Sequence, residues 1–193
     1  MQIQRGTETE KTTLNQPESV SEIKQERLKF PLENLRYFLI TLIVIFFDQL
    51  SKILIRSLLT KSEIVFVTPK FFWLTNIENT GAAFSFSLGS PEVNRLIFIV
   101  VSCLASVLLI YLILHSDKKL EQVSYSLILG GALGNLIDRI IFGSVTDFLW
   151  CDFPDFIMER WPVFNLADSS IVIAITILII GSIFEPKTKN LEE

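Results

Sequence analysis

Two acidic residues stand beside hydrophobic segments of this sequence: Asp147 follows one segment, and Asp168 lies at the start of the next. A close pair of carboxyl groups cannot easily ionise together, so the pair shares one proton and one pKa rises. The ionised group can then draw a proton from water while the protonated group polarises a peptide carbonyl. By chemistry alone, the same pair could instead hold a cation or relay protons.

The rest of the sequence excludes several other catalytic arrangements. The only histidine, His115, lies at the far end of another hydrophobic segment, so it cannot join Asp147 and Asp168 in a Ser-His-Asp or Cys-His arrangement. There is no HExxH motif, and carboxylates without histidine make a poor zinc site. Cys103 lies in an apolar run and Cys151 in a predicted loop, which supports neither a disulfide framework nor a zinc site. The net charge of −4, with no basic stripe, gives no sign of nucleic-acid binding.

The elements that must position the two aspartates are hydrophobic segments long enough to cross a membrane. Half of the 193 residues are hydrophobic, and the mean hydropathy is +0.47. Runs of about 20 residues match ~30 Å of hydrocarbon. The pattern predicts an all-α membrane protein with four transmembrane helices over these ranges: 35–55, 96–114, 123–142 and 166–184. The third is the least apolar, and it is included because an odd number of spans would separate the chain ends without support from the charges.

Basic residues near the spans predict the orientation. They precede the first span, fill the link between the second and third, and follow the fourth: Lys24, Arg27, Lys29, Arg36, Lys118, Lys119, Lys187 and Lys189. The positive-inside rule therefore places both termini and this link in the cytoplasm, and segments 56–94 and 143–163 outside. Four basic residues in the outer segments weaken the contrast without reversing it: Arg56, Lys61, Lys70 and Arg160.

Composition divides the chain into three regions. Residues 1–30 are polar and predict a disordered cytoplasmic tail, residues 31–186 form the membrane domain, and residues 187–193 form a second cytoplasmic tail. On the outer face, the β-branched and aromatic runs 64–67 and 71–74 predict a small β-hairpin, and the second outer segment is expected to be a loop. The aromatic residues of this face could form a belt in the headgroup layer or a cradle that holds a substrate.

Polar residues on three spans fall at one depth, near the outer surface. In the first span, Asp48 and Lys52 lie at i, i+4, so they can pair as a support that positions the site. In the third span, Asn135, Asp138 and Arg139 share a face and are expected to orient the reacting groups. The fourth span, which begins at the outer face, has Asp168 at its mouth. Each charge in a membrane costs ~2.5–3.5 kcal/mol, and a single shared site explains this common depth better than chance.

Five stretches together resemble one known family, the bacterial lipoprotein signal peptidases, also called signal peptidase II. In chain order they are Asp48-Gln49 with Lys52, Asn79-Thr80-Gly81-Ala82-Ala83-Phe84, Gly134-Asn135 with Asp138-Arg139, Val145 with Asp147-Phe148, and Phe164-Asn165 with Ala167-Asp168-Ser169. The resemblance covers residues 35–184, the whole membrane part. Each motif is weak by itself, but five in order between four spans are highly specific.

The resemblance implies an aspartyl endopeptidase of the bacterial inner membrane that removes the signal peptide of a diacylglyceryl-prolipoprotein, cutting just before the lipidated cysteine. The catalytic pair would be Asp147 and Asp168. Other functional positions carried over from the family are Asp48, Lys52, Asn79, Gly81, Ala82, Asn135, Asp138, Arg139, Asn165 and Ala167. The family needs no metal or other cofactor, and cyclic peptide antibiotics of the globomycin type block it at the dyad. We expect a monomer in contact with membrane lipids.

Small residues at two places have structural explanations as well. Gly81, Ala82 and Ala83 would let a main chain approach a substrate closely, or they form a tight turn. Gly130 and Gly134 make a GxxxG pattern, for which close helix packing is the favoured role.

Two asparagines and two departures from the family complete the prediction. Asn79 and Asn165 are expected to fix the substrate backbone or the aspartates by hydrogen bonds, or to cap a turn and a helix.

The tail 1–30 is longer than the family usually has, and residues 152–160 form an aromatic and acidic insert between the two aspartates.

Two other function classes predict different patterns of residues. A small carrier or ion channel would distribute polar groups through the membrane, whereas the inner halves of these spans are nearly bare. A structural or assembly subunit would use the GxxxG contacts and tolerate loss of either aspartate. The peptidase prediction requires both Asp147 and Asp168.

Overall fold

The computed structural model describes residues 32–68, 71–81, 90–152 and 162–184. The chain divides into residues 1–30 and residues 31–193, and every described element belongs to the second unit. Several predicted features lie outside the described residues: the tails 1–30 and 187–193, Pro69 and Lys70 of the hairpin turn, Ala82, Ala83, and positions 153–160 of the insert.

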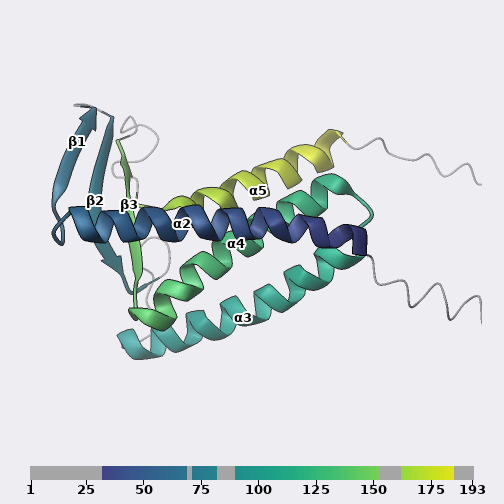
Figure 1. Cartoon of the computed structure of the whole chain (residues 1–193), viewed down its shortest axis with the longest axis horizontal. Coiled ribbons are helices and arrows are strands. Elements are labelled where there is room, and N and C mark those ends of the chain that lie inside the picture. The colour runs from purple at the N-terminus through teal and green to yellow at the C-terminus, as the bar shows by residue number, and fades with distance from the viewer. Residues whose placement is uncertain (1–31, 69–70, 82–89, 153–161, 185–193) are drawn as a thin grey trace, which may run out of the picture. The chain divides into compact units, whose positions relative to one another are not determined.

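Within the described residues, four long helices form the bundle shown in Figure 1: α2 (Phe38–Leu58), α3 (Pro91–His115), α4 (Lys119–Ile141) and α5 (Leu166–Phe184). A 3₁₀ turn, η1 (Leu32–Tyr37), leads into α2. α4 packs against each of the other three helices. Because α4 is enclosed in this way, it tolerates the polar residues that made its segment the weakest predicted span.

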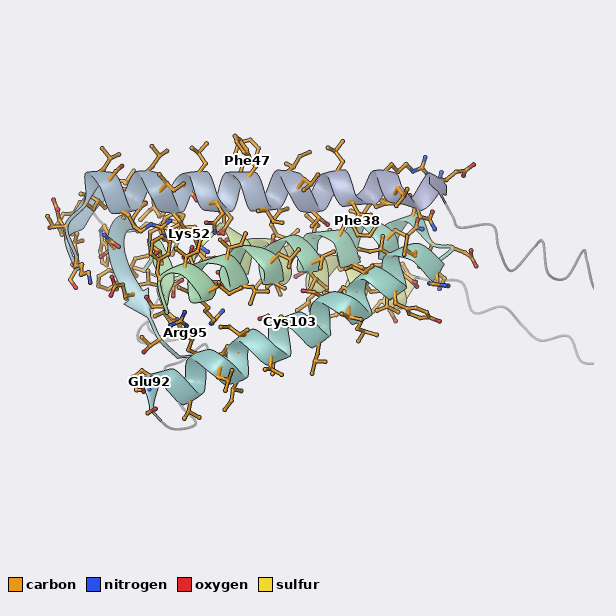
Figure 2. All side chains as sticks on the ribbon, turned by 60° about the horizontal axis from the view of Figure 1, so that its bottom comes forward. Phe38, Phe47, Lys52, Glu92, Arg95 and Cys103 are labelled. Carbon is orange, nitrogen blue, oxygen red and sulfur yellow. The ribbon has the colours of Figure 1, made fainter. Side chains whose placement is uncertain are left out.

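The other three helices are long and apolar enough to cross a membrane, by length and composition: Glu33–Leu58, Pro91–His115 and Leu166–Phe184. They direct large apolar side chains outward, as Figure 2 shows for Phe47, whereas Lys52 on the same helix points into the bundle. The predicted helical membrane fold is therefore confirmed, with hydropathy marking three of its four helices.

The predicted helix boundaries need correction, most of all at the beginning of α3. α3 begins at Pro91 rather than near Leu96, because Ser90 caps it and proline suits the first turn of a helix. The hydroxyl of Ser90 accepts from the N–H of Val93 at 3.5 Å. Hydropathy found the apolar part of this helix and missed its polar first turn.

A three-stranded antiparallel sheet lies at one end of the bundle, in the order β1 (Ile64–Thr68), β2 (Phe72–Asn79) and β3 (Val145–Cys151) (Figure 1). The predicted hairpin, β1 with β2, is confirmed, and β2 runs further than expected. The third strand is a correction, because the second outer segment was expected to be a loop and Cys151 was placed in it. Its seven residues pair with a strand about seventy positions earlier, and such long-range pairing is not visible in local sequence patterns.

Candidate active site

A buried ion pair on α2 forms the base of the site. Lys52 Nζ lies 2.8 Å from Asp48 Oδ2, and both side chains are 0% exposed, which confirms the predicted i, i+4 pair. Lys52 Nζ also donates to Asn135 Oδ1 at 2.9 Å and lies 3.6 Å from Asp138 Oδ2. One ammonium group thus connects α2 to two residues of α4.

Asp48 also holds the beginning of α5. Its Oδ1 accepts from the backbone N–H of Ala167 at 3.0 Å, where a helix N-terminus favours negative charge. Gly134 permits this approach, because a Cβ built at Gly134 would lie 2.6 Å from Asp48 Oδ2. Gly130 lies one turn earlier, and a Cβ built there would lie only 2.6 Å from Val44 Cβ. The predicted close packing at the GxxxG pattern is confirmed, and it occurs between α4 and α2.

Asn165 contacts both aspartates of the predicted pair. It caps α5: its Oδ1 accepts from the N–H of Asp168 at 2.9 Å, while its own N–H donates to Asp168 Oδ2 at 3.2 Å. Its Nδ2 donates to Asp147 Oδ1 at 2.7 Å. The capping function and the contact with the aspartates, predicted as alternatives, are therefore both present.

Asn135 and Asn79 complete the hydrogen bonds to the two carboxyl groups. Asn135 Nδ2 donates to Asp168 Oδ1 at 2.8 Å, and its Oδ1 accepts from Asn165 Nδ2 at 3.1 Å. Asn79 Nδ2, at the end of β2, donates to Asp147 Oδ2 at 2.9 Å. Each carboxyl oxygen of Asp147 and Asp168 accepts at least one N–H, which fixes the orientation of both groups.

Asp147 is buried in β3, and Asp168 is partly exposed at the start of α5. Burial raises the pKa of Asp147 from 3.8 to about 6, and the negative charge of Asp168 acts in the same direction. The hydrogen bonds from Asn79 and Asn165 and the charge of Lys52 oppose this rise in pKa. The carboxyl group of Asp147 therefore retains a proton more readily than an ordinary aspartate does.

Arg139 and Asp138, neighbours on α4, have different surroundings. Arg139 interacts electrostatically with both aspartates of the pair, and its guanidinium lies 4.9 Å from the centre of the Phe98 ring. Its Nη2 donates to the carbonyl of Gly81 at 3.5 Å. The N–H of Gly81 in turn donates to an asparagine side chain of the site, Asn79 Oδ1, at 2.9 Å, so this part of the predicted small-residue stretch forms a turn.

Asp138 contacts neither aspartate through a hydrogen bond; instead its Oδ2 accepts from the N–H of Thr146 at 2.9 Å. Two further contacts of this region were missed from the sequence. Gln49 Nε2 donates to the carbonyl of Gly134 at 3.0 Å, and Arg56 Nη1 donates to Thr146 Oγ1 at 2.8 Å. Gln49 lies within the first motif, whereas Arg56 lies outside all five.

The charges of the described site nearly balance. Its four carboxyl groups face three basic groups: Asp48, Asp138, Asp147 and Asp168 against Lys52, Arg56 and Arg139. A single retained proton would make this cluster neutral, as burial favours. Among the described residues, no group of three or more His, Cys, Asp or Glu side chains could hold a metal ion.

Comparison with known proteins identifies the family of the chain. The sequence profile of a protease family, Signal peptidase (SPase) II, matches residues 40–184. The chain belongs to the signal peptidase II family. A lipoprotein signal peptidase of Serratia marcescens is 41% identical over 146 residues, which cover 74% of this chain and 82% of the relative. One of Halothermothrix orenii is 44% identical over 144 residues, which cover 74% of this chain and 92% of that protein.

Solved structures show that this signal peptidase II family member is similar to known membrane enzymes in fold as well as in sequence. Two structures, each described as a bacterial membrane enzyme studied by the in meso method, match with TM-scores of 0.70 and 0.68 at 31% and 30% identity. The matches cover 82% and 78% of this chain, and 93% and 94% of the two solved chains. The chain is thus a membrane-integral protease of this family, and all five motif regions lie inside the matched residues.

Proposed function

We propose that this chain is an aspartyl endopeptidase that removes the signal peptide from diacylglyceryl-modified prolipoproteins, cutting just before the lipidated cysteine. Asp147 and Asp168 would activate the water. The observation that carries the proposal is the position of Asn165, which donates to Asp147 Oδ1 at 2.7 Å and, through its own N–H, to Asp168 Oδ2 at 3.2 Å. This shared neighbour, together with the effect of the Asp168 charge on the pKa of Asp147, supports a pair that acts on one substrate bond.

In the proposed reaction, Asp147 begins protonated and Asp168 ionised. Asp168 takes a proton from water as the water oxygen attacks the scissile carbonyl carbon, and Asp147 gives its proton to the carbonyl oxygen. The tetrahedral intermediate then collapses: Asp168 protonates the leaving nitrogen, the C–N bond breaks, and one hydroxyl proton returns to Asp147. The buried position of Asp147, with its pKa raised to about 6, supports this assignment of the first proton.

The surroundings of the pair suit a lipid-bearing substrate. Asp168 stands at the first turn of α5 and Asp147 on a strand of the sheet, so the pair lies where the apolar helices meet the sheet (Figure 1). Phe66 and Phe71 of the sheet region expose large apolar surfaces. Because the acyl chains of a lipidated cysteine remain in hydrocarbon, its scissile bond must lie at this kind of boundary.

The proposed location is the bacterial cytoplasmic membrane, with both termini in the cytoplasm and the sheet at the outer, periplasmic face. The basic residues near the α3–α4 link and before α2 support this orientation. Cyclic peptide antibiotics of the globomycin type are expected to inhibit by occupying the aspartate pair, and the enzyme is expected to act as a monomer without a metal.

The proposed reaction is tested with purified full-length protein and one precursor in two forms, with and without the diacylglyceryl group. We expect cleavage of the modified form only, with mass spectrometry placing the lipidated cysteine at the new N-terminus, and an unchanged rate in EDTA. An intact modified precursor would contradict the proposed reaction. Equal cleavage of both forms would contradict the substrate class, and loss of activity in EDTA would contradict the metal-free mechanism.

A further inference from the structure

Arg56, near the end of α2, is a charged residue to which the proposed mechanism gives no part. Its Nη1 donates to Thr146 Oγ1 at 2.8 Å and lies 3.4 Å from both carboxyl oxygens of Asp138. Its guanidinium also lies 4.3 Å from the centre of the Phe142 ring, a cation–π distance. Arg56 therefore links the end of α2 to the end of α4 and to the beginning of β3.

Arg56 and Asp138 hold Thr146 by its hydroxyl and by its main-chain N–H, in addition to a hydrogen bond of 3.5 Å from Asn165 to its carbonyl oxygen. Its Oγ1 accepts from Arg56, and its N–H donates to Asp138 Oδ2 at 2.9 Å. Asp138 is itself buried and paired with Arg56. These two hydrogen bonds fix both the position and the orientation of Thr146, because neither its hydroxyl nor its peptide plane can turn freely.

Asp147 follows Thr146 directly, so its position depends on this hold. Successive side chains of a strand point to opposite faces, which places the Thr146 anchor and the Asp147 carboxyl group on opposite sides of β3. The pairing of β2 with β3 is irregular nearby: Ile77 pairs with Asp147, but the register shifts between Leu74 and Ile77. Regular strand pairing is thus interrupted close to Asp147, which increases the importance of a side-chain anchor.

We propose that Arg56 is a positioning residue for Asp147: it holds Thr146 against Asp138, and this fixes the Asp147 carboxyl group relative to Asp168. The inference rests on the proposed function, since it assumes that Asp147 reacts. Arg56 touches neither aspartate of the pair through a hydrogen bond, so its effect passes through Thr146.

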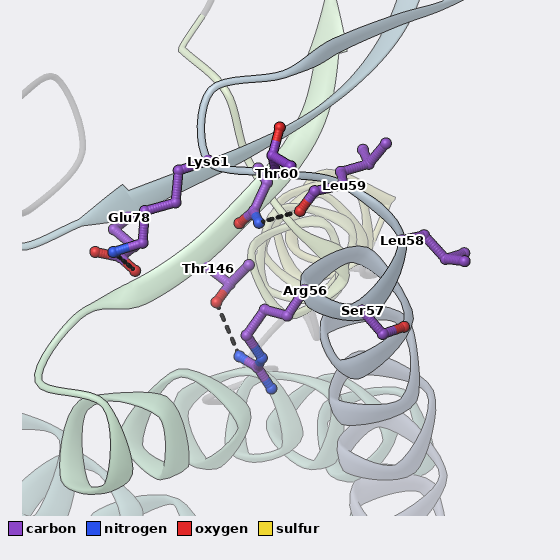
Figure 3. A pocket seen from close by; sticks show the side chains of 9 residues that line it. Arg56, Ser57, Leu58, Leu59, Thr60, Lys61, Glu78 and Thr146 are labelled. Carbon is purple, nitrogen blue, oxygen red and sulfur yellow. Dashed lines mark hydrogen bonds and ion pairs between the residues drawn. The ribbon is translucent and has the colours of Figure 1, made fainter.

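The surroundings of Arg56 offer a direct test. Arg56 is 23% exposed and lines an open pocket of about 530 Å³, shown in Figure 3 with its hydrogen bond to Thr146. Removal of its side chain would leave a space connected to solvent, which a small guanidinium ion can enter. Lys61 lines the same pocket and carries the same charge, but it is 73% exposed and pairs with Glu78 at 2.7 Å. It is therefore the matched control.

The experiment measures kcat and KM on a diacylglyceryl-modified precursor for Arg56→Ala, Arg56→Lys, Thr146→Val, Thr146→Ser and Lys61→Ala. We expect Arg56→Ala and Thr146→Val each to lower kcat on the order of 10- to 100-fold with KM changed less than about 2-fold. Arg56→Lys should lose part of kcat because an ammonium cannot bridge both partners in the same geometry. Thr146→Ser should keep kcat near the parent value, and Lys61→Ala should match the parent.

Two comparisons distinguish positioning from a general loss of structure. The double variant of Arg56→Ala with Thr146→Val should be no slower than the slower single variant. Each single substitution already removes the same contact, the hydrogen bond between Arg56 and Thr146. Millimolar guanidinium should restore part of the kcat of Arg56→Ala and none of that of Thr146→Val. Parent kcat in either single variant, or losses that multiply in the double variant, would overturn the inference.

A further variant separates this inference from the proposed function. If Asp147→Asn cleaves the precursor at the parent rate, the proposed function fails. If Asp147→Asn is inactive while Arg56→Ala keeps the parent kcat, the proposed function stands and the positioning inference fails.

Discussion

At the scale of one residue, burial in the folded chain changes the pKa of the Asp147 carboxyl group. It is enclosed by β3 and by two asparagine side chains, Asn79 and Asn165, each donating to a different carboxyl oxygen. These hydrogen bonds fix the orientation of the group, while desolvation raises its pKa to about 6. The two asparagines therefore orient the carboxyl group and also oppose the rise in its pKa, but burial outweighs them.

The raised pKa predicts a pH-dependent stability difference between the parent and Asp147→Asn. Because the folded-state pKa of about 6 exceeds the ordinary 3.8, Asp147 contributes stability that is fully present below pH 3.8 and is lost as the pH rises through about 6. Asparagine does not ionise, so the stability of the variant should rise relative to that of the parent between pH 4 and pH 7, by about 2 kcal/mol. Thermal unfolding in detergent at both pH values measures this gain, and an equal difference at pH 4 and pH 7 would contradict it.

Lys52 is a buried cation that faces two buried carboxyl groups, Asp48 and Asp138. Lys52→Met would leave Asp48 without its cation in a site that is 0% exposed, which we expect to cost about 3–5 kcal/mol. The double variant with Asp48→Asn should recover much of this loss, since the asparagine oxygen can still accept from Ala167. Unfolding midpoints of the parent, single and double variants test the pair. A double variant no more stable than Lys52→Met would argue against it.

At the scale of elements, α4 organises the site because its glycines allow two other helices to approach. Gly130 faces α2, where a Cβ would lie 2.6 Å from Val44 Cβ and 3.1 Å from the carbonyl oxygen of Thr41. Gly131 faces α5, where a Cβ would lie 2.4 Å from the carbonyl oxygen of Ala167. These contacts involve branch-point and backbone atoms, so the helices themselves would have to separate to admit a methyl group.

Gly130→Ala is therefore predicted to destabilise the bundle by about 1–3 kcal/mol, despite the better helix propensity of alanine. Gly181→Ala on α5 is the matched control: its Cβ would meet Leu120 Cδ2 at 2.9 Å, the far end of a flexible side chain that can move. Thermal unfolding of the two variants in the same detergent compares them. If Gly181→Ala proved the more damaging change, the packing explanation would be wrong.

The sequence predicted these elements unequally, for physical reasons. The helices and the β1–β2 hairpin were predictable because hydrophobic length and β-branched runs are local signals. β3 was missed because its stability comes from pairing with β2, far away in the sequence. In the site, the spacing of Asp48 and Lys52 predicted their contact, whereas the hydrogen bonds of Asn79 and Asn165 to Asp147 join different elements and no spacing encodes them.

At the scale of the whole molecule, the arrangement of the spans decides where the reaction occurs. α2 and α4 end at the sheet, and α3 and α5 begin there, so the α3–α4 link lies at the other end of the bundle (Figure 1). Three helices carry exposed apolar side chains suited to lipid, and α4 is enclosed among them. The proposed site is therefore confined to one membrane surface.

The proposed orientation predicts opposite accessibility for the two ends of the bundle. In a background with Cys103 and Cys151 replaced by serine, Thr60→Cys near the sheet should react with a membrane-impermeant maleimide on intact cells. Asp117→Cys, in the α3–α4 link, should react only after permeabilisation, because the proposed orientation places this basic link in the cytoplasm. The reverse labelling pattern would place the aspartates on the cytoplasmic side and contradict the proposed location.

The most direct test of the aspartate pair is the rate at which Asp147→Asn and Asp168→Asn cleave a diacylglyceryl-modified precursor. Asp117→Asn, the same substitution at an exposed position in the α3–α4 link, is the control. Each single substitution at the pair should lower the rate on the order of 10³-fold or more, since neither asparagine can carry a proton between water and substrate, and the control should match the parent. Cleavage at the parent rate by either folded variant would show that the two carboxyl groups do not perform the reaction.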